Sequence, residues 1–173
     1  RGTLRSVSAD TLGEVQLTGG DEGIPRLDEI LRIVAGQVPL LIEIKSRPEY
    51  DVERSCEAVA KAVAGNTGEH AVMSFDPRVG EWFAKHSPDT VRGLVCTDSY
   101  DNGFMSAWRA PGAIEAAQPD FLATDIRDVP NAFCSLWREA GHPLLSWTIR
   151  SPELRKTALA EVDALISEGE GLA

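Results

Sequence analysis

The sequence is poor in cysteine and has no long apolar run. It contains three cysteines, Cys56, Cys96 and Cys134, in 173 residues. They are far apart and odd in number, so neither a disulfide framework nor a CxxC metal site follows, and we predict a reducing compartment, the cytoplasm. We find no signal peptide and no apolar stretch long enough to span a bilayer, so we expect no membrane insertion.

Positive charge is also scarce. Acidic residues outnumber basic ones by 27 to 17, which gives a net charge of -10. Nucleic acids and anionic membranes both require a basic surface, so neither is an expected partner. A small anionic substrate is not excluded, because it responds to the local field of a cleft. The sequence contains no GxGxxG, P-loop or GxSxG motif.

What is present is a regular alternation of strand and helix patterns. Expected strands start near residues 40, 71, 92, 121, 144 and 164, separated by 20 to 31 residues, with amphipathic helices between them. Such alternation indicates βα units and a parallel sheet. We therefore predict one α/β domain over residues 1–173, with an irregular segment at 1–23 and βα units over 24–173. A complete (β/α)8 barrel needs about 250 residues, so the chain is short by roughly two units.

Proline and capping residues mark the expected helix starts. Pro25 and Pro130 are predicted to open helices at their first helical positions, and Asp76-Pro77 and Ser151-Pro152 are predicted to form a cap followed by a first turn. For Asp76, a helix cap is the favoured interpretation over a metal ligand.

The most informative stretch is Pro39-Leu40-Leu41-Ile42-Glu43-Ile44-Lys45. It is typical of a buried strand that carries one acid and one base late in its length. Side chains alternate in a strand, so Glu43 and Lys45 share a face, near the strand end where α/β proteins place their sites. The acid could hold a cation and the lysine could contact an anion. A salt bridge at a strand end explains the two residues equally well.

The three histidines do not suggest a site. His70 precedes an expected strand, His86 ends a helix and His142 lies between a helix and a strand. All three are therefore expected at the N-terminal end of the sheet, opposite the face where such folds carry catalysis.

Other polar residues follow the expected strands. Asp125 and Arg127 could simply pair with each other. Cys96 would lie at the rim without a histidine to activate it, so a nucleophilic role is not expected. Trp147 shares an expected strand face with Leu145 and Ile149, and either core packing or substrate contact explains it.

Several motifs, in order and spacing, resemble those of the glycerophosphodiester phosphodiesterase family. They are Ile24-Pro25-x-Leu27-x-Glu29, Leu41-Ile42-Glu43-Ile44-Lys45, Met73-Ser74-Phe75-Asp76-Pro77, Leu145-Ser146-Trp147-Thr148-Ile149-Arg150 and Asp163-Ala164-Leu165-Ile166-Ser167-Glu168-Gly169. The series covers about residues 24 to 169, and the strand with Glu43 and Lys45 is its strongest part.

The resemblance implies a TIM barrel that binds one divalent cation, Ca²⁺ or Mg²⁺, and hydrolyses glycerophosphodiesters to sn-glycerol 3-phosphate and an alcohol. It implies that Glu43 is a metal ligand and that Lys45 contacts the phosphate and its developing charge. Trp147 would line the glycerol pocket, with Phe75 as a further candidate.

The sequence also departs from the family pattern. It has no HRG-type strand, no expected strand with Glu-x-Asp and no HD motif, so it resembles the family's barrel from after its second strand. General acid/base groups typically contribute about 10²–10⁴-fold to a rate, and a hard cation requires about six oxygens. We therefore expect the chain alone to be inactive. Because six strands cannot close an eight-stranded barrel, we also expect the chain to be marginally stable or to self-associate through open sheet edges. A non-catalytic phosphate- or metal-binding remnant of the same fold is the alternative, and an unrelated open α/β binding domain is a third.

Overall fold

The computed structural model of the protein describes residues 7–98 and 107–172. Its strands are β1 (Leu40–Glu43), β2 (His70–Ser74), β3 (Val91–Cys96), β4 (Phe121–Asp125), β5 (Leu144–Ile149) and β6 (Ala164–Ser167). Its α-helices are α1 (Ala9–Gly13), α2 (Leu27–Val34), α3 (Val52–Val63), α4 (Pro77–His86), α5 (Ala113–Ala117), α6 (Ala132–Glu139) and α7 (Pro152–Glu161). Short 3-10 helices cover Ala107–Arg109, Ile126–Asp128 and Gly169–Leu172. None of the helices among these residues is long and apolar enough to cross a membrane.

The chain divides into two compact units. The first comprises Arg1–Pro39 and Ala58–Glu69, and the second comprises Leu40–Glu57 and His70–Ala173. In the first unit, Ser8 caps α1 through a hydrogen bond from the backbone N–H of Thr11. This short helix lies inside the segment 1–23 that we expected to be irregular, at Ser8-Ala9-Asp10-Thr11-Leu12, which is typical of a helix start. The single domain expected from the sequence stays a prediction.

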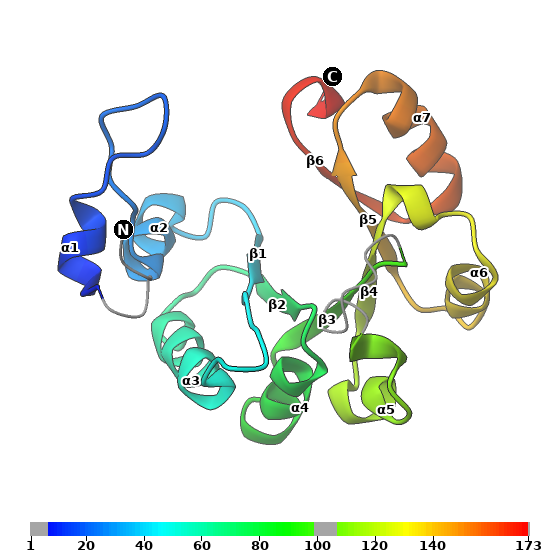
Figure 1. The fold of residues 1–173 in the computed structure, drawn as a ribbon, viewed down its shortest axis with the longest axis horizontal. Coiled ribbons are helices and arrows are strands. Elements are labelled where there is room, and N and C mark those ends of the chain that lie inside the picture. The colour runs from blue at the N-terminus through cyan, green and yellow to red at the C-terminus, as the bar shows by residue number, and fades with distance from the viewer. Residues whose placement is uncertain (1–6, 99–106, 173) are drawn as a thin grey trace. The chain divides into compact units, whose positions relative to one another are not determined.

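The second unit contains the whole sheet. All six strands are parallel and follow one another in the order β1-β2-β3-β4-β5-β6, each bonded to the next. The helices α4, α5, α6 and α7 lie along one side of this sheet (Figure 1). The prediction of six parallel βα units is confirmed.

The helix-facing side of the sheet holds the larger core. Its buried members come from β3, β4, β5 and the helices α6 and α7, among them Leu94, Leu122, Leu144, Cys134 and Ala158. Leu122, Leu144 and Ala158 are wholly buried, with no exposed surface. This layer packs the strands against the helices.

The opposite side of the sheet is packed by side chains of the strands and of Phe75, which directly follows β2. We call the buried members Met73, Val95, Phe121 and Ala123 the inner cluster; partly buried Ala71, Phe75, Leu145, Trp147 and Ile166 pack against it. Gly93 allows this packing, because it pairs with Phe121 across β3 and β4 and a Cβ at Gly93 would lie 2.2 Å from the Phe121 ring. The inner cluster lies on the same side of the sheet as Phe75 and Trp147, two of the predicted site residues.

Two of the expected helix starts are correct and two are wrong. Asp76 and Ser151 are N-caps, with Pro77 and Pro152 in the first turn of α4 and α7. Pro25 lies before α2, because Arg26 forms the cap and Glu29 accepts a hydrogen bond from the Arg26 N–H, which a proline at this position lacks.

Pro130 likewise lies before α6 rather than at its first position. Asn131 is the cap there, and its side-chain oxygen accepts a hydrogen bond from the Cys134 N–H. A proline is compatible with a first helical position, but here a capping side chain follows it and shifts the helix start by two residues.

Candidate active site at the strand ends

The predicted acid and lysine meet at the end of β1. Lys45 Nζ lies 2.8 Å from Glu43 Oε1, and the Glu43 side chain is 25% exposed while that of Lys45 is 77% exposed. Glu43 pairs in register with Met73 of the inner cluster, so it lies on the side of the sheet away from the helices. The shared face expected from the sequence is present, and the two charges form an ion pair.

The two predicted aromatic residues also contact each other. The rings of Phe75 and Trp147 meet edge to face with centroids 5.5 Å apart and an interplanar angle of 79°. Trp147 Nε1 donates a hydrogen bond to the Ala123 carbonyl at 3.0 Å, which fixes the indole against β4. Both residues pack on the inner cluster, so core packing accounts for Trp147, and both stay partly exposed.

One expected neighbour of Trp147 lies on the other side of the sheet. Leu145 packs with Trp147 on the inner cluster, whereas Ile149 is wholly buried in the helix-facing core. The pairing of β5 with β6 shifts register between Ser146 and Ile149, so the simple alternation of faces ends there. The prediction that Trp147 and Ile149 share a face is therefore wrong.

A buried polar network lies directly behind Lys45, and the sequence analysis did not identify it. Ser74 Oγ donates to the Ile44 carbonyl at 2.7 Å, and Ser46 Oγ donates to Asp76 Oδ2 at 2.6 Å. Ser46, Ser74 and Asp76 are 9%, 2% and 3% exposed. The available sequence signal was the pair of serines that flank the strand ends of β1 and β2.

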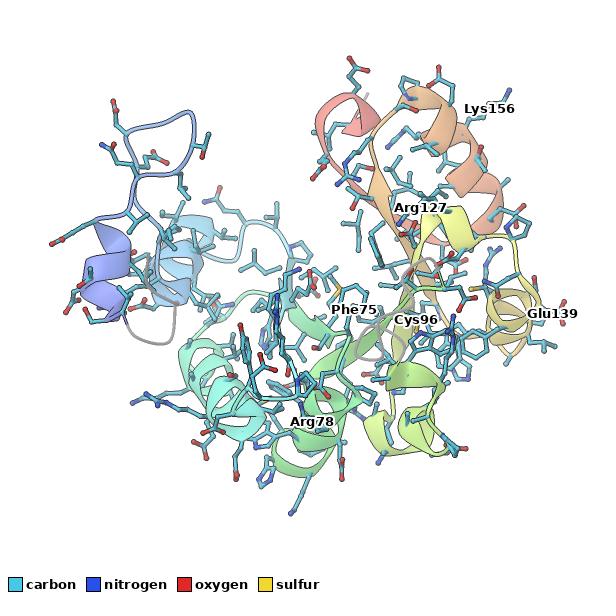
Figure 2. All side chains as sticks on the ribbon, in the orientation of Figure 1. Phe75, Arg78, Cys96, Arg127, Glu139 and Lys156 are labelled. Atoms are coloured by element: carbon cyan, nitrogen blue, oxygen red, sulfur yellow. The ribbon has the colours of Figure 1, made fainter. Side chains whose placement is uncertain are left out.

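The Asp76 carboxylate is held by an arginine as well. Arg78 donates from Nε to Asp76 Oδ1 at 3.0 Å and from its terminal nitrogen to Oδ2 at 2.6 Å. Figure 2 shows Arg78 at the start of α4. Burial raises the pKa of Asp76, but hydrogen bonds from Arg78 and Ser46 outweigh it and hold this pKa below its ordinary value. The carboxylate is therefore charged, and the expectation that Asp76 caps a helix is confirmed.

The same spacing recurs after β4. Asp125 is 2% exposed and accepts hydrogen bonds from Arg127, at 2.9 Å from Nε and 2.5 Å from the terminal nitrogen. The pairing expected from the sequence is confirmed. Asp125 also pairs in register with Trp147, which places this ion pair beside the aromatic residues.

The three cysteines are not activated as nucleophiles. Cys96 lies in the helix-facing core with Cys134, and burial raises the pKa of each thiol, with the charges of nearby acids acting in the same direction. Burial and the charge of Asp76 raise the pKa of Cys56 to about 12. All three are free thiols. Because a nucleophilic cysteine needs a stabilised thiolate, none of them suits that role.

All three histidines lie at the N-terminal end of the sheet, as predicted. His70 begins β2, His86 is the last residue of α4 and His142 precedes β5. The rings of His86 and His142 lie against Trp82 and Trp137, with centroids 4.7 and 4.5 Å apart. These positions are at the opposite end of the strands from Lys45.

The described residues do not complete a divalent cation site. Glu43 offers one carboxylate, and one of its oxygens is bonded to Lys45. Within residues 7–98 and 107–172 there is no group of three or more histidine, cysteine or acidic side chains that could hold a metal ion. Because Ca²⁺ and Mg²⁺ bind about six oxygens, Glu43 could supply only a part of such a shell.

Two surface hollows lie away from the predicted site residues. One, of about 520 Å³, is lined by Arg138, Glu139, Gly141, His142, Pro143 and Asp163 in the second unit. The other, of about 440 Å³, lies in the first unit between α2 and the segment 62–67. In the hollow of the second unit, Arg138 donates a hydrogen bond to Asp163 at 2.9 Å, so these two charges already pair with each other.

Comparison with solved structures identifies the architecture. A phosphodiesterase from Oleispira antarctica, solved with the product sn-glycerol 3-phosphate, superposes with a TM-score of 0.80 at 18% identity, over 99% of this chain and 70% of its own. The chain has the fold of the glycerophosphodiester phosphodiesterases. Its six parallel strands match a TIM barrel that lacks its first strands, as the sequence predicted.

Two further structures agree. A glycerophosphodiester phosphodiesterase from Parabacteroides distasonis matches with a TM-score of 0.75 at 17% identity, over 95% of this chain and 68% of its own. A protein named as a glycerophosphoryl diester phosphodiesterase, from Silicibacter pomeroyi, matches with a TM-score of 0.71 at 23% identity. That match covers 87% of this chain but 55% of the Silicibacter chain, so this chain spans about half the length of that relative. No protein-family model and no curated protein matches the sequence.

Proposed function

We propose that this chain carries the phosphate-binding side of a glycerophosphodiester phosphodiesterase site. Lys45 would contact the phosphate of a glycerophosphodiester and its developing negative charge, and Trp147 and Phe75 would line the glycerol pocket. Glu43 would supply one ligand to a divalent cation, Ca²⁺ or Mg²⁺. The products of the whole reaction would be sn-glycerol 3-phosphate and an alcohol.

The observation that carries this proposal is the position of the ion pair between Glu43 and Lys45. It lies at the C-terminal end of a parallel strand, where folds of this kind place their active sites. The pair is also on the side of the sheet that the helices leave free. The Oleispira structure, with sn-glycerol 3-phosphate bound, has the same fold and supports a small phosphate ester as the ligand.

In this site the chain's own residues would bind and orient the glycerophosphodiester. The Lys45 ammonium can donate to a phosphate oxygen, and charge-assisted hydrogen bonds are stronger than neutral ones. The apolar face made by Phe75 and Trp147 suits the carbon side of a glycerol unit, while their fixed edge-to-face contact limits where it can lie. Within residues 7–98 and 107–172, the histidines lie at the opposite end of the strands, so none is placed to move a proton here.

A second candidate is a non-catalytic module that binds a phosphate ester with the same residues. The lack of a metal-binding group among residues 7–98 and 107–172 favours it for the chain by itself. Both candidates require that Lys45 bind phosphate, and they differ in whether hydrolysis follows.

The test is a calorimetric titration of the purified 173-residue chain with sn-glycerol 3-phosphate, with and without Ca²⁺ or Mg²⁺. We expect Lys45→Met to weaken binding by about tenfold or more, because a hydrogen bond to a charged group contributes about 1.5–3 kcal/mol. Lys156→Met, which removes the same charge from α7, should leave binding unchanged. Equal affinities for the wild type and Lys45→Met would overturn the proposal.

Hydrolysis distinguishes the two candidates. We expect the chain alone to release no sn-glycerol 3-phosphate from glycerophosphocholine at any concentration of Ca²⁺ or Mg²⁺. Metal-dependent release that Lys45→Met abolishes would establish the enzyme and refute the expectation that these residues are inactive by themselves.

A further inference from the structure

The backbone on both sides of Lys45 is held by the neighbouring strand. Before it, the Ile44 N–H donates to the Met73 carbonyl at 2.8 Å, and the Ile44 carbonyl accepts from Ser74 Oγ at 2.7 Å. After it, Ser46 Oγ donates to Asp76 Oδ2 at 2.6 Å. Lys45 is thus the exposed residue between two buried, hydrogen-bonded ones.

The bonds of Asp76 exceed what a helix cap requires. Ser151 and Asn131 cap α7 and α6 with one neutral acceptor each. Asp76 also caps, through a 3.0 Å hydrogen bond from the Arg78 N–H, but its second oxygen accepts from both Ser46 and the Arg78 guanidinium. A neutral cap would satisfy the helix, so the buried charge has a further role.

Arg78 extends the same contact to the next residue of the loop. Its terminal nitrogen, which bonds Asp76, also donates to the Arg47 carbonyl at 3.2 Å. The start of α4 therefore holds the chain after Lys45 at two successive residues, Ser46 and Arg47. The Lys45 side chain is 77% exposed, so its direction depends on this backbone and on the ion pair with Glu43.

We propose that Asp76, acting through Ser46, is a positioning residue that fixes the backbone on which Lys45 is mounted for binding a phosphate. The inference rests on the proposed function, since it gives Lys45 a phosphate to meet. It adds that the start of α4, which does not touch the ligand in this scheme, sets the affinity of the site.

The sharpest test removes the hydrogen bond between Ser46 and Asp76 and leaves the cap of α4 intact. Ser46→Ala deletes the hydroxyl, whereas Ser46→Thr keeps it. We expect Ser46→Ala to weaken binding of sn-glycerol 3-phosphate by about twofold to twelvefold, which corresponds to one hydrogen bond of about 0.5–1.5 kcal/mol. Ser46→Thr should restore most of this loss. Ser87→Ala is the matched control, because it breaks a 2.8 Å bond between the Ser87 and Thr90 hydroxyls after α4, far along the chain from Lys45.

A second pair of variants tests whether positioning of Lys45 needs the negative charge of Asp76. Asp76→Asn keeps an acceptor for the cap but removes the carboxylate, and we expect it to weaken binding at least as much as Ser46→Ala. Asp163→Asn is its control, since Asp163 also accepts from an arginine, Arg138, and from a backbone N–H, but at the N-terminal end of β5. Equal losses in the two aspartate variants would mean that general destabilisation, and not positioning, explains the effect.

A ligand-free measurement separates this inference from the proposed function. Nitrogen-15 relaxation should reveal increased motion of the Lys45 amide in Ser46→Ala and in Asp76→Asn, but not in the two controls. If the wild type binds no phosphate ester, the proposed function fails and the relaxation data still decide the positioning role. If Lys45 moves no more in Ser46→Ala than in the wild type, or if both variants bind like the wild type, the inference is refuted.

Discussion

The ion pair between Glu43 and Lys45 predicts an unusual effect on phosphate binding. Without a cation, a phosphate must compete with the Glu43 carboxylate for the Lys45 ammonium, which lies 2.8 Å away. Glu43→Gln removes that competitor and also a negative charge that repels the phosphate. We therefore expect the variant to bind sn-glycerol 3-phosphate more tightly than the wild type when no divalent cation is present.

The size of the effect follows from the exposure of the pair. Lys45 is 77% exposed and Glu43 25%, so water screens their attraction, and pairs of this kind contribute about 0.2–1 kcal/mol. Loss of the competition should therefore tighten phosphate binding by about 1.5-fold to fivefold. The effect should shrink as ionic strength rises, because salt screens exposed charges.

Isothermal titration in metal-free buffer at low and high salt measures this directly. Glu139→Gln is a suitable control, because it removes the same charge from the last residue of α6, at the other end of the strands from Lys45. Unchanged or weaker binding by Glu43→Gln would refute the reasoning, since it would mean that Glu43 does not hold Lys45 away from the ligand.

Three further results are expected. The pKa of Asp76 lies below its ordinary value of 3.8 in the folded chain, so the stability that its carboxylate contributes above pH 3.8 disappears as pH falls through the folded pKa. Urea titrations should find Asp76→Asn most destabilising near neutral pH and progressively less so as pH falls below 3.8. Gly93→Ala should lower the unfolding free energy by about 1–3 kcal/mol in the same assay, because the added methyl would overlap the buried Phe121 ring. Among the described residues β1 and β6 are the edge strands of the sheet, and these edges should make the chain self-associate in sedimentation velocity experiments; a monodisperse monomer with a sharp melt would contradict this.

The strand and helix pattern could be predicted because its signals are local. Short apolar runs mark β2, β3 and β4, namely Ala71-Val72-Met73, Leu94-Val95-Cys96 and Phe121-Leu122-Ala123, and most of these residues are buried. Asp76-Pro77 and Ser151-Pro152 mark helix starts through caps that act within three residues. Pro25 and Pro130 misled the assignment because a proline is equally compatible with the position before a cap. Only the hydrogen bonds from the Arg26 N–H to Glu29 and from the Cys134 N–H to Asn131 distinguish the two positions.

The candidate site was predictable only in part. Alternation along β1 correctly put Glu43 and Lys45 together, but alternation along β5 failed at Ile149, where a register shift breaks the pattern. The contacts of Ser46 with Asp76 and of Ser74 with Ile44 each join residues 30 positions apart in the chain. No short-range signal encodes such contacts, because they depend on the register between β1 and β2.

The place of β1 in the sheet explains why the residues that hold the backbone around Lys45 all come from the end of β2 and the start of α4. Within the described sheet β1 is an edge strand whose strand partner is β2. A strand held by one neighbour is easily displaced at its end, and the last backbone hydrogen bond from β1 to β2 is the one from the Ile44 N–H to the Met73 carbonyl. Ser74 and Asp76, both contributed from the C-terminal end of β2, continue the connection past that point to Ile44 and Ser46. The backbone at Lys45, which we propose contacts the phosphate, is therefore held in place by residues at the junction between β2 and α4. Substitutions at this junction should weaken phosphate binding more than they lower the stability of the fold.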